Sequence, residues 1–256
     1  MVNYLLKKSY QLKDLKEIEF KDLWGDHGVF TTMWIFGNPS KILFFNEHIN
    51  NLIKSSKAYS IFKKSLKSDI QNLLKDNLKS KIKYNHLLRI AVNKKILSIS
   101  LRKRIKPKSN FDLKLVNLKR QKPEFKNLKY REILRYLSKL DNSKADIGLC
   151  SSNKILETGT SNLLFIKDNK FFSPKNNFYK GITYKFFKSK IKKIIKKDIF
   201  VHSLKEFDEI ILIGSGKGVT SVKTINQIKW KRKSLKFYNI LLNYYKTAVN
   251  KCQRSM

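Results

Sequence analysis

The stretch LETGTSNLLFI, residues 156–166, decides the fold of this chain. It places one acidic residue, Glu157, before a turn, and Ser161 and Asn162 lead directly into an apolar run of strand character. Three other segments keep a fixed order around it: EFKNLKY precedes it, and KGITYKFF and DEIILIGSGKGV follow it. Each segment alone is a weak signal, and a surface turn between two strands would explain the first equally well. Their order and separations carry the argument.

Apolar periodicity around these segments predicts a mixed chain of helices and strands. Before the linker we expect a hairpin over 28–46, helices over 48–66 and 68–78, and a hairpin over 86–105. After it we expect strands at 147–150, 155–156, 162–167, 170–173 and 210–213, and helices over 130–140, 183–197 and 235–249. Strands and helices do not alternate regularly, which favours an α+β or α/β chain over a doubly wound sheet.

A polar stretch without periodicity, residues 117–124, contains Pro123 and predicts the linker between two domains. We therefore expect an N-terminal α+β domain over 1–118 and a C-terminal domain over 119–256.

The chain carries a formal net charge of +37 at pH 7, which first suggests a nucleic-acid or membrane partner. However, lysine is spread over nearly every segment, and arginine, which suits bidentate phosphate contacts, is a minority. Enrichment in Asn, Ile, Phe and Tyr matches a bias toward AT-rich codons, which explains much of the lysine as well. We expect no specific nucleic-acid partner.

The two cysteines, Cys150 and Cys252, predict neither a disulfide framework nor a metal site, and the four histidines lack ligand spacing. The N-terminus has no apolar run of signal-peptide length, and no stretch reaches membrane-spanning length. The expectation is a cytoplasmic protein with no membrane partner.

Taken in order, the four segments resemble the fold-type IV enzymes that use pyridoxal 5'-phosphate (PLP). That family contains branched-chain and D-amino acid aminotransferases and 4-amino-4-deoxychorismate lyase. The resemblance covers most of the chain and is densest from 120 to 225. It implies a two-domain fold like that of D-amino acid aminotransferase, with the cofactor in the interdomain cleft. It also implies a small-molecule amino substrate and a homodimer.

The resemblance assigns the covalent link with PLP to Lys126, which follows the linker as the family's lysine does. Lys129 competes with it, and a surface role would suit any single lysine of this chain. A second cation nearby would lower the pKa of either lysine and aid nucleophilicity. Tyr130 is a candidate beside the cofactor ring, or a core aromatic residue.

In the family, the acid that matches Glu157 pairs with the pyridine nitrogen of the cofactor, and residues matching Ser161 and Asn162 support it. Gly181, Ile182 and Thr183 open a helix whose free N–H groups suit a phosphate, although Thr183 could also be a plain N-cap. Three loop residues complete the cofactor and substrate set implied by the resemblance: Ser215 and Gly216 for phosphate and substrate, and Lys217 for a substrate carboxylate.

The N-terminal segment WGDHGVFTTMWIF resembles the family's Gly-Asp turn and following strand. Its Thr31 and Thr32 match the lyase branch better than the aminotransferases, and either is a candidate proton relay. Two arginines of the family are missing, since Asn51 and Trp34 stand in their places. Losing one bidentate phosphate contact costs about 1.5–3 kcal/mol unless another group, such as Lys54, compensates.

Three hypotheses follow. The first is a PLP-dependent lyase that converts 4-amino-4-deoxychorismate to 4-aminobenzoate and pyruvate in folate synthesis. The second is a branched-chain or D-amino acid aminotransferase of the same fold. The third is a basic binding protein without catalytic activity.

Overall fold

The computed structural model describes residues 4–253, which divide into two compact units. The N-terminal unit comprises Met1–Arg104, Phe125–Arg131 and Lys251–Met256, and the C-terminal unit comprises Ile105–Glu124 and Glu132–Asn250. The chain thus returns to the N-terminal unit for the short segment that contains Lys126. The boundary predicted after residue 118 falls inside the first segment of the C-terminal unit.

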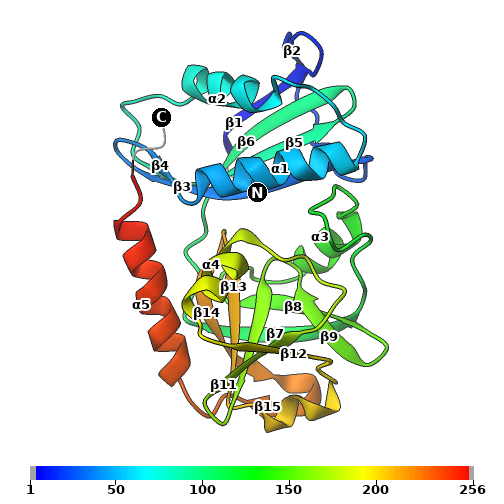
Figure 1. Ribbon diagram of the computed structural model, residues 1–256, viewed down its shortest axis with the longest axis vertical. Helices are drawn as coiled ribbons and strands as arrows, with labels where there is room; N and C mark the ends of the chain where they lie inside the picture. Colours follow the sequence, from blue (N-terminus) through cyan, green and yellow to red (C-terminus); the bar gives the residue numbers. More distant parts are fainter. Residues whose placement is uncertain (1–3, 254–256) are drawn as a thin grey trace. The chain divides into compact units, whose positions relative to one another are not determined.

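The N-terminal unit is built on a six-stranded antiparallel sheet with the order β2-β1-β6-β5-β3-β4 (Figure 1). The strands are β1 Tyr4–Gln11, β2 Glu17–Ile18, β3 Gly28–Gly37, β4 Lys41–Ile42, β5 Tyr84–Asn93 and β6 Ile96–Lys103. Helices α1 Phe45–Ala58 and α2 Leu66–Asn77 pack on one face of this sheet.

The two faces of β3 have different partners because successive side chains of a strand point in opposite directions. Val29, Met33 and Ile35 enter the core, together with Ile49 and Leu52 of α1. The alternate residues of β3, which include Phe30 and Thr32, therefore lie on the face away from α1.

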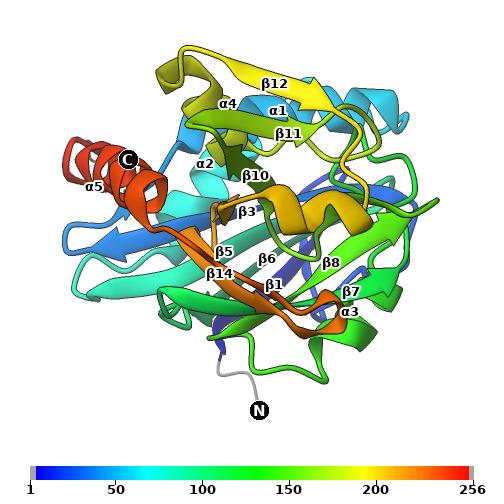
Figure 2. The same cartoon turned by 90° about the horizontal axis from the view of Figure 1, so that it is seen from below.

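The C-terminal unit is built on a nine-stranded curled sheet with the order β12-β11-β10-β13-β14-β7-β8-β9, with β15 paired to β14 (Figure 2). Its strands are β7 Asn110–Asn117, β8 Ala145–Ser151, β9 Lys154–Thr158, β10 Asn162–Lys167, β11 Lys170–Pro174, β12 Ile194–Lys197, β13 Glu209–Gly214, β14 Gly218–Ile225 and β15 Trp230–Lys231. Three helices accompany these strands: α3 Arg131–Leu137, α4 Ile182–Lys190 and α5 Lys236–Asn250. Short 3-10 helices lie at His202–Glu206 and Asn226–Ile228.

Strand β13 lies in the middle of this sheet, and all of its residues are buried, as its unbroken apolar run predicts. Phe165, Leu212 and Val222 of three neighbouring strands join one apolar cluster with Phe207 and Trp230. Helix α4 packs against β13, and α5 packs against β13 and β14. The loops that follow β9, β10 and β13 are thus carried by buried, rigid strands.

Several predicted elements are confirmed, namely the strands in 147–173, the strand at 210–213 and the C-terminal helix. The predicted helix over 183–197 is wrong beyond Lys190, because residues Ile194–Lys197 form β12 parallel to β11. Ile194 and Ile195 there pair with Phe171 and Phe172, and β-branched residues favour such strands. Their spacing matched a helical stripe by coincidence.

The first predicted hairpin is also partly wrong. Its second strand shrinks to β4, and Phe45, which the sequence pattern assigned to that strand, begins α1. The predicted helix over 48–66 ends early, at Ala58, because Ser60 adopts a left-handed backbone conformation with φ 55°. The main partner of β3 is β5, which is distant in sequence.

No helix within residues 4–253 is long and apolar enough to cross a membrane. Over the same residues, no three His, Cys, Asp or Glu side chains gather in a way that could hold a metal ion.

Candidate active site

The segment that carries Lys126 runs alongside β3. The N–H of Phe30 donates to the carbonyl of Lys126 at 2.9 Å, and the N–H of Leu128 donates to the carbonyl of Gly28 at 2.9 Å. The Lys126 Nζ lies 5.0 Å from the centroid of the Phe30 ring. Backbone pairing therefore fixes Lys126 beside a strand that the sequence places almost a hundred residues away.

The structure separates Lys126 from its competitor Lys129. The Nζ of Lys129 donates to the carbonyl of Gly25 at 2.6 Å, and its side chain is exposed. Lys126 is half-buried and faces an aromatic ring. The surroundings of the two lysines therefore differ: the Lys129 ammonium is bound to a backbone carbonyl, and the Lys126 ammonium lies over the Phe30 ring.

Phe30, the ring next to Lys126, belongs to an aromatic cluster of the N-terminal unit. The Trp24 ring stacks on Tyr130 with centroids 5.4 Å apart, and it meets Phe30 edge-on at 4.8 Å. The guanidinium carbon of Arg89 lies 4.1 Å from the Trp24 ring centroid. Tyr130 is buried, so the cluster holds it rigidly beside the lysine segment.

The two candidate threonines of β3 point to opposite faces. The hydroxyl of Thr31 hydrogen-bonds with Nδ1 of His48 on α1 at 2.7 Å, and both residues are buried. Thr32 lies on the same face as Phe30 and is paired across the sheet with Arg89. Thr32 is therefore on the face that also carries Lys126, whereas Thr31 is engaged with the helix behind the sheet.

Glu157 is held by a buried arginine that the sequence analysis assigned to the linker. Nε and Nη2 of Arg120 donate to the two carboxylate oxygens of Glu157 at 2.9 and 3.2 Å. Both side chains are 4% exposed. This bidentate pair fixes the plane of the carboxylate.

Asn162 fixes the start of α4. Its Nδ2 donates to the carbonyl of Tyr179 at 2.5 Å, and its Oδ1 accepts the N–H of Gly181 at 3.0 Å. A side chain at Gly181 would bring a Cβ within 2.9 Å of that same Oδ1. Asn162 thus ties β10 to the start of α4, and glycine at position 181 leaves room for its amide.

Two hydroxyls meet at the N-terminus of α4. The Oγ1 of Thr183 and the Oγ of Ser215 lie 3.4 Å apart, although they come from α4 and from the loop after β13. The first N–H groups of a helix have no partner within the helix, and the helix dipole adds partial positive charge there. Ile182 and Thr183 contribute such groups, so the arrangement fits the phosphate of PLP.

The other members of the predicted set lie close by. Ser215, Gly216 and Lys217 form the loop between β13 and β14, and Gly214 packs so tightly on Ser161 that a Cβ would lie 2.8 Å from its Oγ. The Nζ of Lys217 pairs with Asp146 at 2.5 Å and with Oγ1 of Thr160 at 2.9 Å. The sequence predicts a substrate carboxylate for Lys217, and in this structure Lys217 pairs with the carboxylate of Asp146.

Trp34 and Asn51, which stand where the family has arginines, make other contacts in this structure. The Trp34 ring stacks on Phe36 with centroids 4.4 Å apart, and the guanidinium of Arg104 lies 4.2 Å from it. Asn51 is a half-buried residue of α1 whose carbonyl accepts the hydroxyl of Ser55. Lys54 is exposed.

Sequence reasoning missed three charged residues beside the predicted ones: Arg89 in the N-terminal unit, and Arg120 and Asp146 in the C-terminal unit. Arg120 stood in a polar stretch without periodicity, and its partner lies 37 positions away. Asp146 directly precedes an apolar run, so the sequence places a charged group next to a buried strand, where it needs a partner. Acidic residues are scarce in this chain, 19 against 56 basic ones, which makes such a position a usable signal. Arg89 interrupts the apolar run of β5 between Leu88 and Ile90, and the same argument would have singled it out.

Comparison with known proteins defines the class. A family model for the amino-transferase class IV proteins matches residues 28–225, and the chain therefore belongs to that family. A search of curated protein sequences finds no match. Membership makes the chain a PLP-dependent enzyme, of the group that contains aminotransferases and lyases.

Solved structures share the fold at low sequence identity. A branched-chain aminotransferase from Thermoproteus uzoniensis has a TM-score of 0.79 and 14% identity, covering 97% of this chain and 96% of that one. A 4-amino-4-deoxychorismate lyase from Pseudomonas aeruginosa has a TM-score of 0.75 and 14% identity, covering 94% and 98%. A hypothetical aminotransferase from Mycobacterium tuberculosis in a PLP-bound form has a TM-score of 0.66 and 12% identity, covering 94% and 98%.

Proposed function

We propose that the protein is a lyase that cleaves 4-amino-4-deoxychorismate into 4-aminobenzoate and pyruvate. The observation that carries the proposal is the placement of Thr32, a hydroxyl on the face of β3 beside the half-buried Lys126. A proton donor at this place serves an elimination, in which a leaving group must be protonated. Simple amino transfer has no leaving group to protonate.

The reaction is redox-neutral and needs no second substrate. The C–H bond beside the substrate nitrogen breaks, the C–O bond to the enolpyruvyl group breaks, and the ring becomes aromatic. The proton ends on the enolpyruvyl fragment, which becomes pyruvate. When bound, PLP supplies an electron sink for the charge that develops as the C–H bond breaks.

The roles of this chain's residues follow from their surroundings. Lys126 holds the cofactor and then accepts the proton from the carbon beside nitrogen, and the hydroxyl of Thr32 donates to the departing group. Glu157, fixed by Arg120, would accept the pyridine N–H of bound PLP, and Ile182, Thr183, Ser215 and Gly216 would bind its phosphate. Tyr130 would border the ring. Arg89, on the same face as Thr32, pairs with Asp22 and supports Trp24 of the aromatic cluster.

The second candidate is an aminotransferase for branched-chain or D-amino acids. The high TM-score of 0.79 with the Thermoproteus uzoniensis enzyme favours it, since that protein is a branched-chain aminotransferase. The small-molecule amino substrate and the homodimer implied by the resemblance belong to either candidate.

Product analysis separates the two. The PLP-loaded protein is incubated with 4-amino-4-deoxychorismate while pyruvate is measured, and in parallel with branched-chain or D-amino acids and 2-oxoglutarate while glutamate is measured. We expect pyruvate release that the Lys126→Ala variant lacks and the Lys129→Ala control retains. Glutamate formation without pyruvate release would replace the lyase by the aminotransferase.

A further inference from the structure

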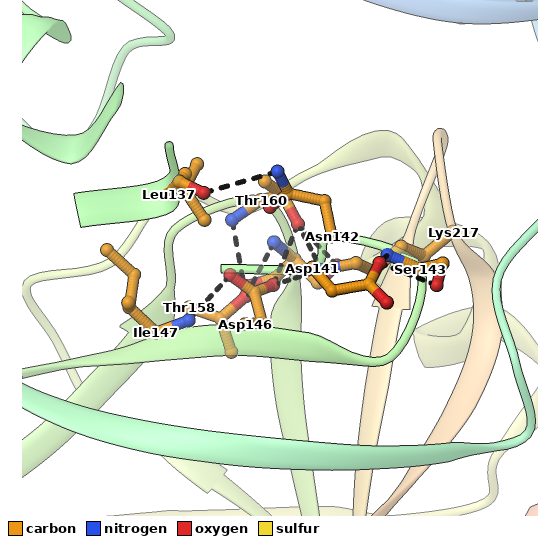
Figure 3. A network of polar contacts seen from close by, with 10 residues as sticks. Leu137, Asp141, Asn142, Ser143, Asp146, Ile147, Thr158, Thr160 and Lys217 are labelled. Atoms are coloured by element: carbon orange, nitrogen blue, oxygen red, sulfur yellow. Dashed lines mark hydrogen bonds and ion pairs between the residues drawn. The ribbon is translucent and has the colours of Figure 1, made fainter. Parts of the chain in front are cut away.

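A buried ion pair connects three segments of the C-terminal unit. Asp146, at the start of β8, is fully buried, and the side chain of Lys217 is 10% exposed. One oxygen of Asp146 accepts Lys217 at 2.5 Å, Thr158 at 2.9 Å and Thr160 at 2.8 Å, and the other accepts the N–H of Ile147 at 2.8 Å (Figure 3). The carboxylate is therefore fully satisfied by donors from β8, from the turn after β9 and from the loop after β13.

The Lys217 side chain is buried, unlike most lysines of this lysine-rich chain. It donates to both Asp146 and Thr160 and lies 4.7 Å from the centroid of the Phe111 ring. Burial lowers the pKa of Lys217, and the charge of Asp146 opposes that shift. Asp146 is the acidic group that faces Lys217 from these elements, and Lys217 also contacts the Thr160 hydroxyl and the Phe111 ring.

The pair crosses the sheet. Strands β8 and β13 are not neighbours, since β14 and β7 lie between them in the strand order. The side chain of Lys217 thus reaches from the β13–β14 loop to a strand two places beyond the hairpin. The hydroxyls of Thr158 and Thr160 donate to the same carboxylate. These two residues belong to the turn that connects Glu157 to Ser161.

The loop between β13 and β14 needs a side-chain contact to fix it, because its glycines allow many backbone conformations. It is three residues long and runs between Gly214 and Gly218, and Gly218 has φ +73°. Glycine loses more conformational entropy than other residues when it is ordered, and the loop itself contains Gly216. The Lys217 contact holds one end of the loop that carries Ser215, whose hydroxyl also lies 3.4 Å from Oγ1 of Thr183.

Stability alone does not account for the pair. Replacing a buried ion pair by apolar residues of similar volume is often neutral or stabilising, so such a pair is weak evidence for stability. Its geometry instead determines where two functional segments lie relative to each other.

We propose that Lys217 and Asp146 are positioning residues that hold the Ser215–Gly216 loop and the Thr158–Ser161 turn in the arrangement that binds the phosphate of PLP. The inference rests on the phosphate-binding role proposed for Ser215 and Thr183. It replaces the role predicted for Lys217 from sequence, which was direct contact with a substrate carboxylate.

The test compares two ligands that differ only in the phosphate. The PLP-free protein is titrated with PLP and with pyridoxal, and both dissociation constants are measured by tryptophan fluorescence. In Lys217→Met we expect the Kd for PLP to rise about tenfold, the equivalent of one charge-assisted hydrogen bond, while the Kd for pyridoxal is unchanged. A role in stability alone would weaken both ligands alike.

Matched variants complete the design. Asp146→Asn should lower the preference for PLP to a similar degree, and the double variant should be no worse than either single one, because the two groups act as one unit. The double variant carries no unpaired buried charge, so it keeps the test valid if Lys217→Met fails to fold. Lys233→Met serves as the control, since Lys233 pairs with Asp208 on the surface of the same unit.

Three outcomes would overturn the inference. In the first, the folded variants keep the wild-type preference for PLP over pyridoxal. In the second, the KM for substrate rises in Lys217→Met while the Kd for PLP is unchanged, and Lys217 then contacts substrate directly. In the third, the wild type itself shows no preference for PLP over pyridoxal, and the proposed phosphate site falls along with the inference.

Discussion

The two units of this protein hold their predicted site residues by different means. In the N-terminal unit, Lys126 and Tyr130 are positioned by backbone pairing with β3 and by stacked rings. In the C-terminal unit, Glu157 and the loop that contains Ser215 are positioned by two buried ion pairs. Rings are adaptable partners with modest energies, whereas a buried charge is costly to leave unpaired.

The difference suits the tasks of the residues. The role proposed for Lys126, which includes moving a proton, suits a lysine that lies over a ring. The roles proposed for Glu157 and for the loop that contains Ser215 need fixed positions, which buried ion pairs provide. The comparison therefore predicts that substitutions in the two units differ in size and in kind.

The largest effect should come from breaking the Arg120–Glu157 pair. Arg120→Met leaves an uncompensated carboxylate in a buried place, so we expect the free energy of unfolding to fall by about 3–5 kcal/mol. Urea denaturation of the PLP-free protein measures this. The control is Lys233→Met, which breaks an exposed pair and should cost at most about 1 kcal/mol. Equal losses in both variants would show that the burial of Arg120 has no energetic consequence.

The next effect concerns catalysis and separates the two threonines. Thr32→Val should slow pyruvate release about a hundredfold, because a positioned proton donor typically contributes that much or more. Thr31→Val should leave the turnover nearly unchanged and cost about 1 kcal/mol of stability through the lost bond to His48. Steady-state kinetics and denaturation of both variants test this. A large loss of turnover in Thr31→Val alone would reverse the assignment.

A smaller effect is expected for the rings of the N-terminal unit. Trp24→Leu removes contacts with Phe30 and Tyr130, each worth about 0.5–1.5 kcal/mol. The free energy of unfolding should fall less than in Arg120→Met, and Trp24→Phe should restore part of it. If Trp24→Leu proved more destabilising than Arg120→Met, the contrast between the units would be lost.

The smallest effect concerns the two thiols, one in each unit. Burial raises the pKa of Cys150 in the C-terminal unit to about 12, and it also raises the pKa of the partly exposed Cys252. Native protein should therefore label at Cys252 and hardly at Cys150 with a thiol reagent, and a rise from pH 8 to pH 10 should not speed labelling of Cys150. Mass spectrometry of the labelled peptides checks this; fast labelling of Cys150 would mean that the C-terminal core opens readily.

Much of the C-terminal unit could be predicted from sequence because its signals are local. The run after Ser161 is a strand, Gly181 precedes a helix, and the apolar run of β13 is buried, as the pattern indicated. The end of α4 could not be predicted, because Ile194 and Ile195 satisfy both a helical stripe and a strand, and only pairing with β11 decides between them.

The charged supports of the site lay beyond such reasoning. Arg120 and Glu157 are 37 positions apart, and Lys217 and Asp146 are 71 apart, so no local pattern links either pair. The return of residues Phe125–Arg131 to the N-terminal unit depends on pairing with β3, which is equally distant. The identity of the site residues came from motifs, and the means by which they are held came from the fold.

The most direct test of the account is to locate the lysine that binds PLP. The protein is loaded with PLP, reduced with borohydride, digested and examined by mass spectrometry, with Lys126→Ala and Lys129→Ala treated in the same way. We predict a single pyridoxyl group on Lys126, absent from Lys126→Ala and present in Lys129→Ala. Labelling at Lys129, or no labelling at saturating PLP, would contradict the account.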